Sequence, residues 1–167
     1  SVQERKDVDF TSVYFRDLNN GPWFGINEKE PFSPASLLKV PLLMYILSLD
    51  EDQPGFLSKK ITDKGDNYAT LEQSIKPEHP IKKGQTYTVE ELLRHAIVES
   101  DNNAAAVLIG SVGKSKFETI FTDLGLVNPE DSAGVMSVKD YASFFRILFN
   151  ASYINRKFSE AALTLLT

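Results

Sequence analysis

The fold is decided by the stretch FSPASLLKVPLLMYILSL, residues 32–49. Ser33 is a residue type that caps helices, and Pro34 suits a first helical turn because its ring holds φ near the helical value. The apolar residues that follow cover every face of such a helix, and a helix that is apolar all round belongs in a core. The stretch therefore predicts a buried central helix. Pro41 lacks the backbone donor of a helical hydrogen bond, so we expect the helix to bend just after Lys39.

The start of this helix carries a serine and a lysine, Ser36 and Lys39. They are three residues apart, about one turn, so their side chains share a face. Apolar surroundings and the positive end of the helix dipole favour loss of the lysine proton, and a neutral amine beside a hydroxyl can act as its base. The free backbone N–H groups of a helix start also suit an oxyanion. The pattern predicts Ser36 as a nucleophile and Lys39 as its base.

Ser-x-x-Lys is a weak pattern when it stands alone. The chain contains a second copy, Ser111 to Lys114, which we attribute to chance. The first copy therefore needs support from a second element of the sequence.

That second element is the tripeptide Ser100-Asp101-Asn102. It follows a predicted helix that Thr88 and Glu91 begin, since their spacing is that of a capping box. A loop between two helices can aim the Ser100 hydroxyl and the Asn102 amide into a cleft, while Asp101 turns inward and binds backbone groups. By itself the tripeptide is an ordinary helix cap. Its value lies in the combination with Ser36 and Lys39.

The rest of the chain contains one hairpin and several helices. Residues 9–17 and 23–27 read as strands joined by a turn at Asn19-Asn20-Gly21, where Asn and Gly tolerate positive φ. Residues 51–87 are polar and irregular. Besides the helix that follows Thr88, the apolar spacing and cap residues predict helices at 68–75, 103–109, 116–124 and 138–149, and a last one after Ser159.

The composition excludes several classes of protein. There is no cysteine among the 167 residues, which removes disulfides, thiolate metal sites and cysteine nucleophiles. The two histidines, His79 and His95, lack the spacing of metal ligands, so no metal site is predicted and a Ser-His-Asp triad is not supported. With a formal net charge of −5, the chain offers no basic surface for nucleic acid. A hydrolase built from this sequence needs a base other than histidine.

Together, the hairpin, FSPASLLKVPLL and TVEELLRHAIVESDNNAA resemble the class A serine β-lactamases and the related penicillin-binding D-alanyl-D-alanine peptidases. The resemblance covers most of the chain. It implies an α/β (α+β) fold, with a mostly helical domain packed on an antiparallel sheet. Residues 34–167 would form the helical domain, and residues 1–33 would supply the N-terminal hairpin of the sheet.

The resemblance also implies roles for individual residues. Ser36 would attack a β-lactam or peptide carbonyl, and Lys39 would take or relay its proton. Ser100 would pass a proton to the departing nitrogen, Asn102 would hold the substrate amide, and Asp101 would be a structural support. The Ser36 N–H would form half of the oxyanion hole. The implied partner is a small β-lactam or a peptidoglycan peptide, without cofactor, metal or nucleic acid, in a protein exported to the periplasm or cell surface.

Two features differ from the family pattern. Class A enzymes activate the deacylating water with a glutamate on a long loop, followed by an asparagine. Here residues 127–135, VNPEDSAGV, are too short for that loop, and Glu130 and Asp131 fit a turn around Asn128-Pro129. Nor does a Lys-Thr-Gly or Lys-Ser-Gly motif occur, so we expect a segment beyond Thr167 or a second chain to complete the sheet.

Three functions follow from these observations. A peptidase-like serine acyl enzyme that deacylates slowly fits the predicted catalytic residues and the short 127–135 segment. An active class A-like β-lactamase would need a different deacylating base. A non-catalytic β-lactam sensor or peptidoglycan-binding module would form no acyl-enzyme. Metal hydrolases and nucleic-acid binders are poorly supported.

Overall fold

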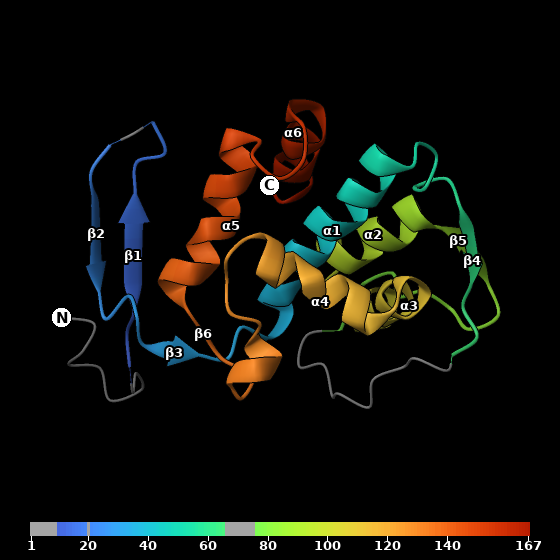
Figure 1. The fold of residues 1–167 in the computed structure, drawn as a ribbon. Helices are drawn as coiled ribbons and strands as arrows, with labels where there is room; N and C mark the ends of the chain where they lie inside the picture. The colour runs from blue at the N-terminus through green and yellow to red at the C-terminus, as the bar shows by residue number, and fades with distance from the viewer. Residues whose placement is uncertain (1–9, 20, 66–75) are drawn as a thin grey trace.

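The computed structural model describes residues 10–19, 21–65 and 76–167, and Figure 1 shows a β-hairpin beside a group of helices. Strands β1 (Val13–Arg16) and β2 (Trp23–Ile26) pair antiparallel, with Val13 opposite Ile26 and Arg16 opposite Trp23. The predicted hairpin is confirmed. Part of its turn, Asn20, and residue 9 of the predicted first strand lie outside the described residues.

The central helix α1 (Lys39–Asp52) is buried on all sides over its first half, as its composition predicts. Met44 and Ile46 are 0% exposed, because α2, α3, α4 and α6 all contact this helix. A 3₁₀ turn, η2 (Ala35–Leu38), precedes α1, and no side chain caps it, so the prediction of a Ser33 cap was wrong. Pro41 lies in the first turn of α1, where an N–H has no intrahelical partner, so it removes no hydrogen bond from this helix. The chain before Lys39 forms the 3₁₀ turn η2, where an α-helix that bends after Lys39 was predicted.

The other described helices follow the predicted order, and side chains cap α2, α3, α5 and α6 but not α4. The Thr88–Glu91 capping box is present, and the Ser137 hydroxyl accepts from the Asp140 N–H as predicted. The last helix is capped by Asn155, not Ser159, so it begins earlier than predicted. The helices are α2 (Val89–Val98), α3 (Asn102–Val112), α4 (Lys114–Asp123), α5 (Val138–Asn150) and α6 (Arg156–Leu165).

Two short ladders besides the hairpin were not predicted. β3 (Pro31–Phe32) pairs with β6 (Met136–Ser137), and β4 (Lys60–Thr62) pairs with β5 (Thr86–Thr88). Strands of two or three residues carry no readable alternation, and the polar, irregular sequence of residues 51–87 predicts loops. The predicted helix at 68–75 lies outside the described residues.

The β3–β6 ladder also brings residues before the predicted domain boundary at 33 and 34 into contact with the helical part. The division into residues 1–33 and 34–167 stays a prediction.

The hairpin has two different faces. Val13, Phe15, Phe24 and Ile26 share one face by strand alternation and are 37–54% exposed. Tyr14 lies on the other face, and β1 packs against α5 there. Within residues 10–19, 21–65 and 76–167, no helix combines the length and apolar character needed to cross a membrane.

Candidate active site

The side chain of Lys39 is the buried centre of the candidate site. It is 9% exposed, and its amine lies at the junction of α1 with the loop between α2 and α3. The amine donates to the Ser100 hydroxyl at 2.9 Å, to Oδ1 of Asn102 at 2.8 Å and to the backbone carbonyl of Ser100. The structure therefore brings together three of the predicted residues.

The environment of Lys39 makes its neutral form easier to reach than that of an exposed lysine. Burial lowers the pKa of the Lys39 amine from the usual 10.5, and the nearby Asp101 carboxylate opposes part of that effect. A lysine with a lowered pKa is a general base at a lower pH than an exposed lysine. This is the electrostatic condition that the sequence predicted.

Ser36 occupies the middle of the 3₁₀ turn η2 and is exposed. In a 3₁₀ helix the side chains at positions i and i+3 eclipse, so Ser36 and Lys39 project from one side of the chain. Among the described residues, no hydrogen bond joins the Ser36 hydroxyl to the Lys39 amine. Ser36 and Lys39 thus lie on the same side of the chain. Hydrogen bonds to Ser100 and Asn102 hold the Lys39 amine at the loop between α2 and α3.

Two residues of the site have a left-handed backbone. Ala35, directly before Ser36, has φ of 45°, and Ser100 has φ of 52°. Non-glycine residues adopt this conformation at a cost, and they gather where a side chain must be aimed precisely by its surroundings. Ala35 directly precedes Ser36, a predicted catalytic residue, and Ser100 is itself a predicted catalytic residue.

Asp101 is 1% exposed and organises the loop that carries its two neighbours. Its Oδ1 accepts from the backbone N–H of Asn103 at 2.8 Å and of Ala104 at 3.3 Å, which caps α3. Its Oδ2 accepts from the N–H of Ile81 at 2.8 Å. One carboxylate therefore joins the start of α3 to the segment before β5.

A second carboxylate, which sequence reasoning missed, holds the same segment. Glu99 accepts from the backbone N–H of Glu78 at 3.1 Å and lies 3.3 Å from Nδ1 of His79. Hydrogen bonds with His79 lower the pKa of the Glu99 carboxyl. The only sequence feature that pointed to Glu99 as part of the site is its position directly before Ser100.

The second Ser-x-x-Lys copy has a different environment. The Ser111 hydroxyl donates to the carbonyl of Leu108 at 2.7 Å within its own helix. Lys114 is exposed and pairs with Glu118 and Glu130, and the hydrogen bond with Glu130 raises the pKa of its amine. A lysine in this state holds its proton, so this copy lacks a base.

Glu130 lies in the 3₁₀ turn η3 (Pro129–Ser132), which Asn128 caps. Its side chain is 61% exposed and its carboxylate binds Lys114 at 3.2 Å. The turn predicted for this segment is confirmed. The Glu130 carboxylate is therefore already engaged by a cationic partner.

The fold is that of the β-lactamases. It superimposes on a β-lactamase from Francisella tularensis with a TM-score of 0.72 and 22% identity, over 86% of this chain and 59% of that one. It matches carbapenemase VCC-1 from Vibrio cholerae with a TM-score of 0.74 and 20% identity, over 92% and 63%. It matches PBP-A with a TM-score of 0.73 and 22% identity, over 93% and 61%.

The chain belongs to the β-lactamase enzyme family, whose model matches residues 3–167. No curated protein matches it. A PBP-A variant, matched over 93% of this chain with a TM-score of 0.74 and 22% identity, was solved as an acyl-enzyme complex with penicillin G. The chain spans about 60% of the length of these solved structures.

Proposed function

We propose that the chain carries the acylating centre of a serine enzyme acting on β-lactams or D-alanyl-D-alanine peptides. One observation carries the proposal: the buried Lys39 amine, whose pKa burial lowers, is held against the Ser100 hydroxyl and the Asn102 amide. A base, a second hydroxyl and a polar amide then converge beside an exposed serine. No cofactor enters this scheme.

In the proposed reaction, the Ser36 oxygen forms a bond to the substrate carbonyl carbon and its proton passes to the neutral Lys39 amine. The C–N bond of the substrate then breaks. The proton returns from Lys39 through the Ser100 hydroxyl to the departing nitrogen, a path that the 2.9 Å contact between those two groups supports. Asn102 would hold the amide of the substrate.

The Ser36 N–H is our candidate for one oxyanion-hole donor. The first hydrogen bond of η2 runs from the Leu37 N–H to the Pro34 carbonyl at 2.8 Å, and the Ser36 N–H lies one residue before that first donor. The first N–H groups of a helical turn have no partner inside it, so such a group is available for an oxyanion.

We further propose that deacylation is slow. Glu130 is engaged with Lys114, and residues 127–135 form a turn where the class A enzymes have a long loop. The PBP-A variant that was solved as an acyl-enzyme with penicillin G shows that a protein of this fold can hold such an adduct. A class A-like β-lactamase that uses another deacylating base is the alternative, supported by the family match.

The experiment is to incubate the purified chain with a labelled penicillin and measure its intact mass. We expect a one-to-one adduct, located on the peptide that contains Ser36. Ser36→Ala should abolish the adduct, whereas Ser111→Ala, the matched control from the second Ser-x-x-Lys copy, should retain it.

The outcomes of this experiment separate the functions. A lasting adduct supports the slow acyl enzyme, and fast release of hydrolysed product supports the β-lactamase. No adduct on the native chain favours the non-catalytic sensor or peptidoglycan-binding module. An adduct that survives in Ser36→Ala would remove the proposed mechanism.

The hairpin needs a partner in this proposal. Its outer residues Phe15 and Phe24 are 53% and 54% exposed, and a two-stranded hairpin alone is marginally stable in water. We propose that further strands, from a later part of the same protein or from a second chain, complete the sheet. Hydrogen exchange tests this: the β1 amides should exchange more slowly in the full gene product than in residues 1–167. Equal rates would contradict it.

We also propose that the protein acts in the periplasm or at the cell surface, where peptidoglycan is found. Membership of the β-lactamase family supports this location. Fractionation of cells that express the full gene product tests it, and recovery only in the cytoplasm would contradict it.

A further inference from the structure

A cavity of about 230 Å³ lies between β1 and α5, on the inner face of the hairpin. Its wall combines apolar and basic side chains. Phe15 and Leu18 contribute from the hairpin side and Phe145 from α5, and two arginines, Arg16 and Arg146, come from the two elements. None of the residues that line it is acidic. The cavity is separate from Ser36 and has no part in the acylation proposed above.

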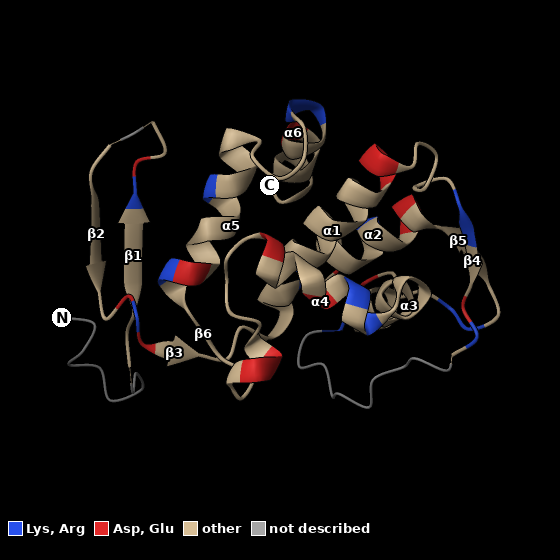
Figure 2. Cartoon of the chain, in the orientation of Figure 1, with Lys and Arg blue, Asp and Glu red and all other residues tan. Residues whose placement is uncertain are grey.

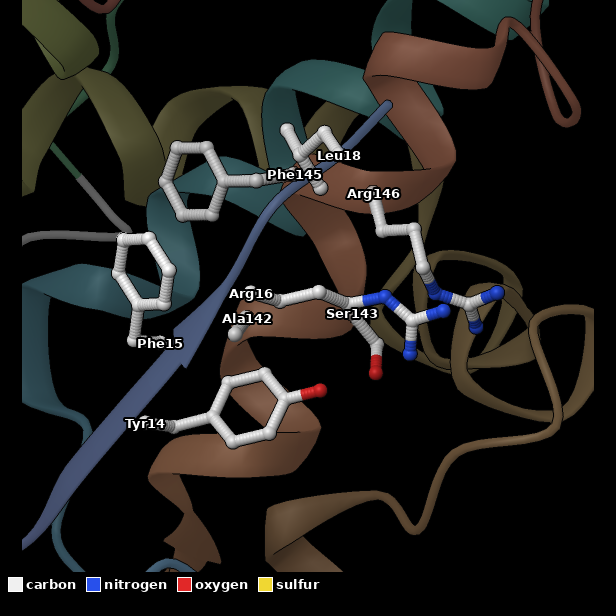
Figure 3. A pocket seen from close by; sticks show the side chains of 8 residues that line it. All are labelled: Tyr14, Phe15, Arg16, Leu18, Ala142, Ser143, Phe145 and Arg146. Carbon is white, nitrogen blue, oxygen red and sulfur yellow. The ribbon is translucent and has the colours of Figure 1, made fainter. Parts of the chain in front are cut away.

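The two arginines face the same space. Figure 3 shows Arg16 on β1 and Arg146 on α5 among the side chains that line this cavity, and Figure 2 shows basic residues on the facing parts of β1 and α5. Neither guanidinium makes a hydrogen bond or ion pair with any residue that the structure describes. Two like charges that line one cavity without a counter-charge repel each other, and a bound anion relieves that repulsion.

A third donor points into the same cavity. The Tyr14 hydroxyl lies near the arginines in Figure 3 and makes no hydrogen bond within the described part of the chain. Ser143 is different, because its hydroxyl already donates to the carbonyl of Lys139 at 3.2 Å. The donors available to a ligand are therefore the two guanidinium groups and one phenol.

The nearest acidic residues are engaged elsewhere. Asp17 follows Arg16 directly, but its carboxylate accepts from the Asn19 N–H at 2.9 Å and lies against Gly21 in the hairpin turn. Asp140, on the first turn of α5, accepts from the Ser137 hydroxyl at 2.7 Å. Neither residue lines the cavity.

We propose that this cavity binds an organic anion through Arg16 and Arg146. A carboxylate or a phosphate ester presents oxygens that match the planar donors of a guanidinium, and Arg pairs bind both groups in a bidentate way. The apolar wall formed by Leu18 and Phe145 selects a ligand with an apolar group next to its charge, in preference to a bare inorganic ion.

Calorimetric titration of the purified chain with three small probes tests the site. The probes are 3-phenylpropanoate, its neutral amide, and phenyl phosphate, so the apolar part is similar while the charged group changes. We expect at least one anion to bind and the amide to bind about tenfold more weakly or not at all. A preference between the two anions identifies whether the natural ligand carries a carboxylate or a phosphate.

Variants then assign the binding to this cavity. Arg16→Gln and Arg146→Gln should each weaken anion binding about tenfold, while Arg94→Gln, an exposed arginine on α2, should leave it unchanged. Both cavity arginines are exposed, so the variants should fold, and their thermal unfolding midpoints check this. Arg146→Lys should bind at an intermediate level because an ammonium lacks the planar pair of donors. Equal binding of amide and anion, or binding insensitive to both Gln substitutions, would overturn the proposal.

Discussion

The Lys39 amine donates to Oδ1 of Asn102 at 2.8 Å, although the two residues begin different helices, α1 and α3. This contact holds the Lys39 amine against the start of a second helix. A long flexible side chain normally loses considerable rotamer entropy when it is ordered, and here packing and hydrogen bonds have already ordered it. The proposed base is therefore in position before a substrate arrives.

Replacing Lys39 should slow acylation strongly. A positioned base contributes about 10²–10⁴-fold to a rate, so Lys39→Ala should lose about that factor. Lys39→Arg should be nearly as slow, because a guanidinium keeps its proton. The measurement is the single-turnover rate of penicillin labelling. Lys114→Ala is the control and should react normally, whereas a near-normal rate for Lys39→Arg would exclude Lys39 as the base.

The acylation rate should rise with pH. Burial lowers the pKa of Lys39, so the reactive neutral amine accumulates at a pH below the usual 10.5. Below that lowered pKa the rate should increase about tenfold per pH unit, and above it the rate should level off. Rates of labelling measured across the pH range where the fold is intact give the midpoint. A midpoint at or above 10.5 would contradict the assignment of Lys39.

Turnover should be limited by deacylation. Reaction of the chain with a chromogenic β-lactam should give a stoichiometric burst followed by little steady hydrolysis. Glu130→Gln should change neither phase, because this carboxylate binds Lys114 on the surface. Fast steady hydrolysis that disappears in Glu130→Gln would show that the 127–135 segment activates water after all.

Removing the Asp101 carboxylate should destabilise the whole fold. Asp101→Ala leaves the N–H groups of Ile81 and Asn103 without their acceptor, and a buried unsatisfied donor costs about 1–3 kcal/mol. The free energy of unfolding in urea measures the loss. Asp131→Ala, at an exposed position of η3, is the matched control and should change it little. A loss no larger than the control's would show that solvent replaces these bonds.

Local patterns in the sequence predicted the parts of the fold that local interactions determine. The all-apolar α1, the Thr88–Glu91 capping box and the hairpin each depend on residues close together in the chain. The last helix was misplaced because Asn155 and Ser159 are both acceptable caps, and only packing chooses between them. The β3–β6 ladder could not be predicted, since two residues gain their strand conformation from a distant partner.

The candidate site shows the same limit. Ser36 and Lys39 are readable as a pair because one helical turn joins them, whereas the contact of Lys39 with Asn102 depends on how α1 meets α3. Glu99 was missed because nothing in its sequence neighbourhood indicates that the 78–81 segment returns to it. The cavity that holds Arg16 and Arg146 likewise exists only once β1 lies on α5.

The β3–β6 ladder has a consequence for how the protein reaches its native state. It joins Phe32 to Met136, so a long stretch of chain must close into a loop before this contact forms. Such contacts form slowly, because closing the loop costs chain entropy before the contact contributes any favourable free energy. Phe32 leads directly into the turn that carries Ser36. The nucleophile should thus be set in place late in folding, and penicillin labelling during refolding would report completion of the last steps rather than collapse of the helices.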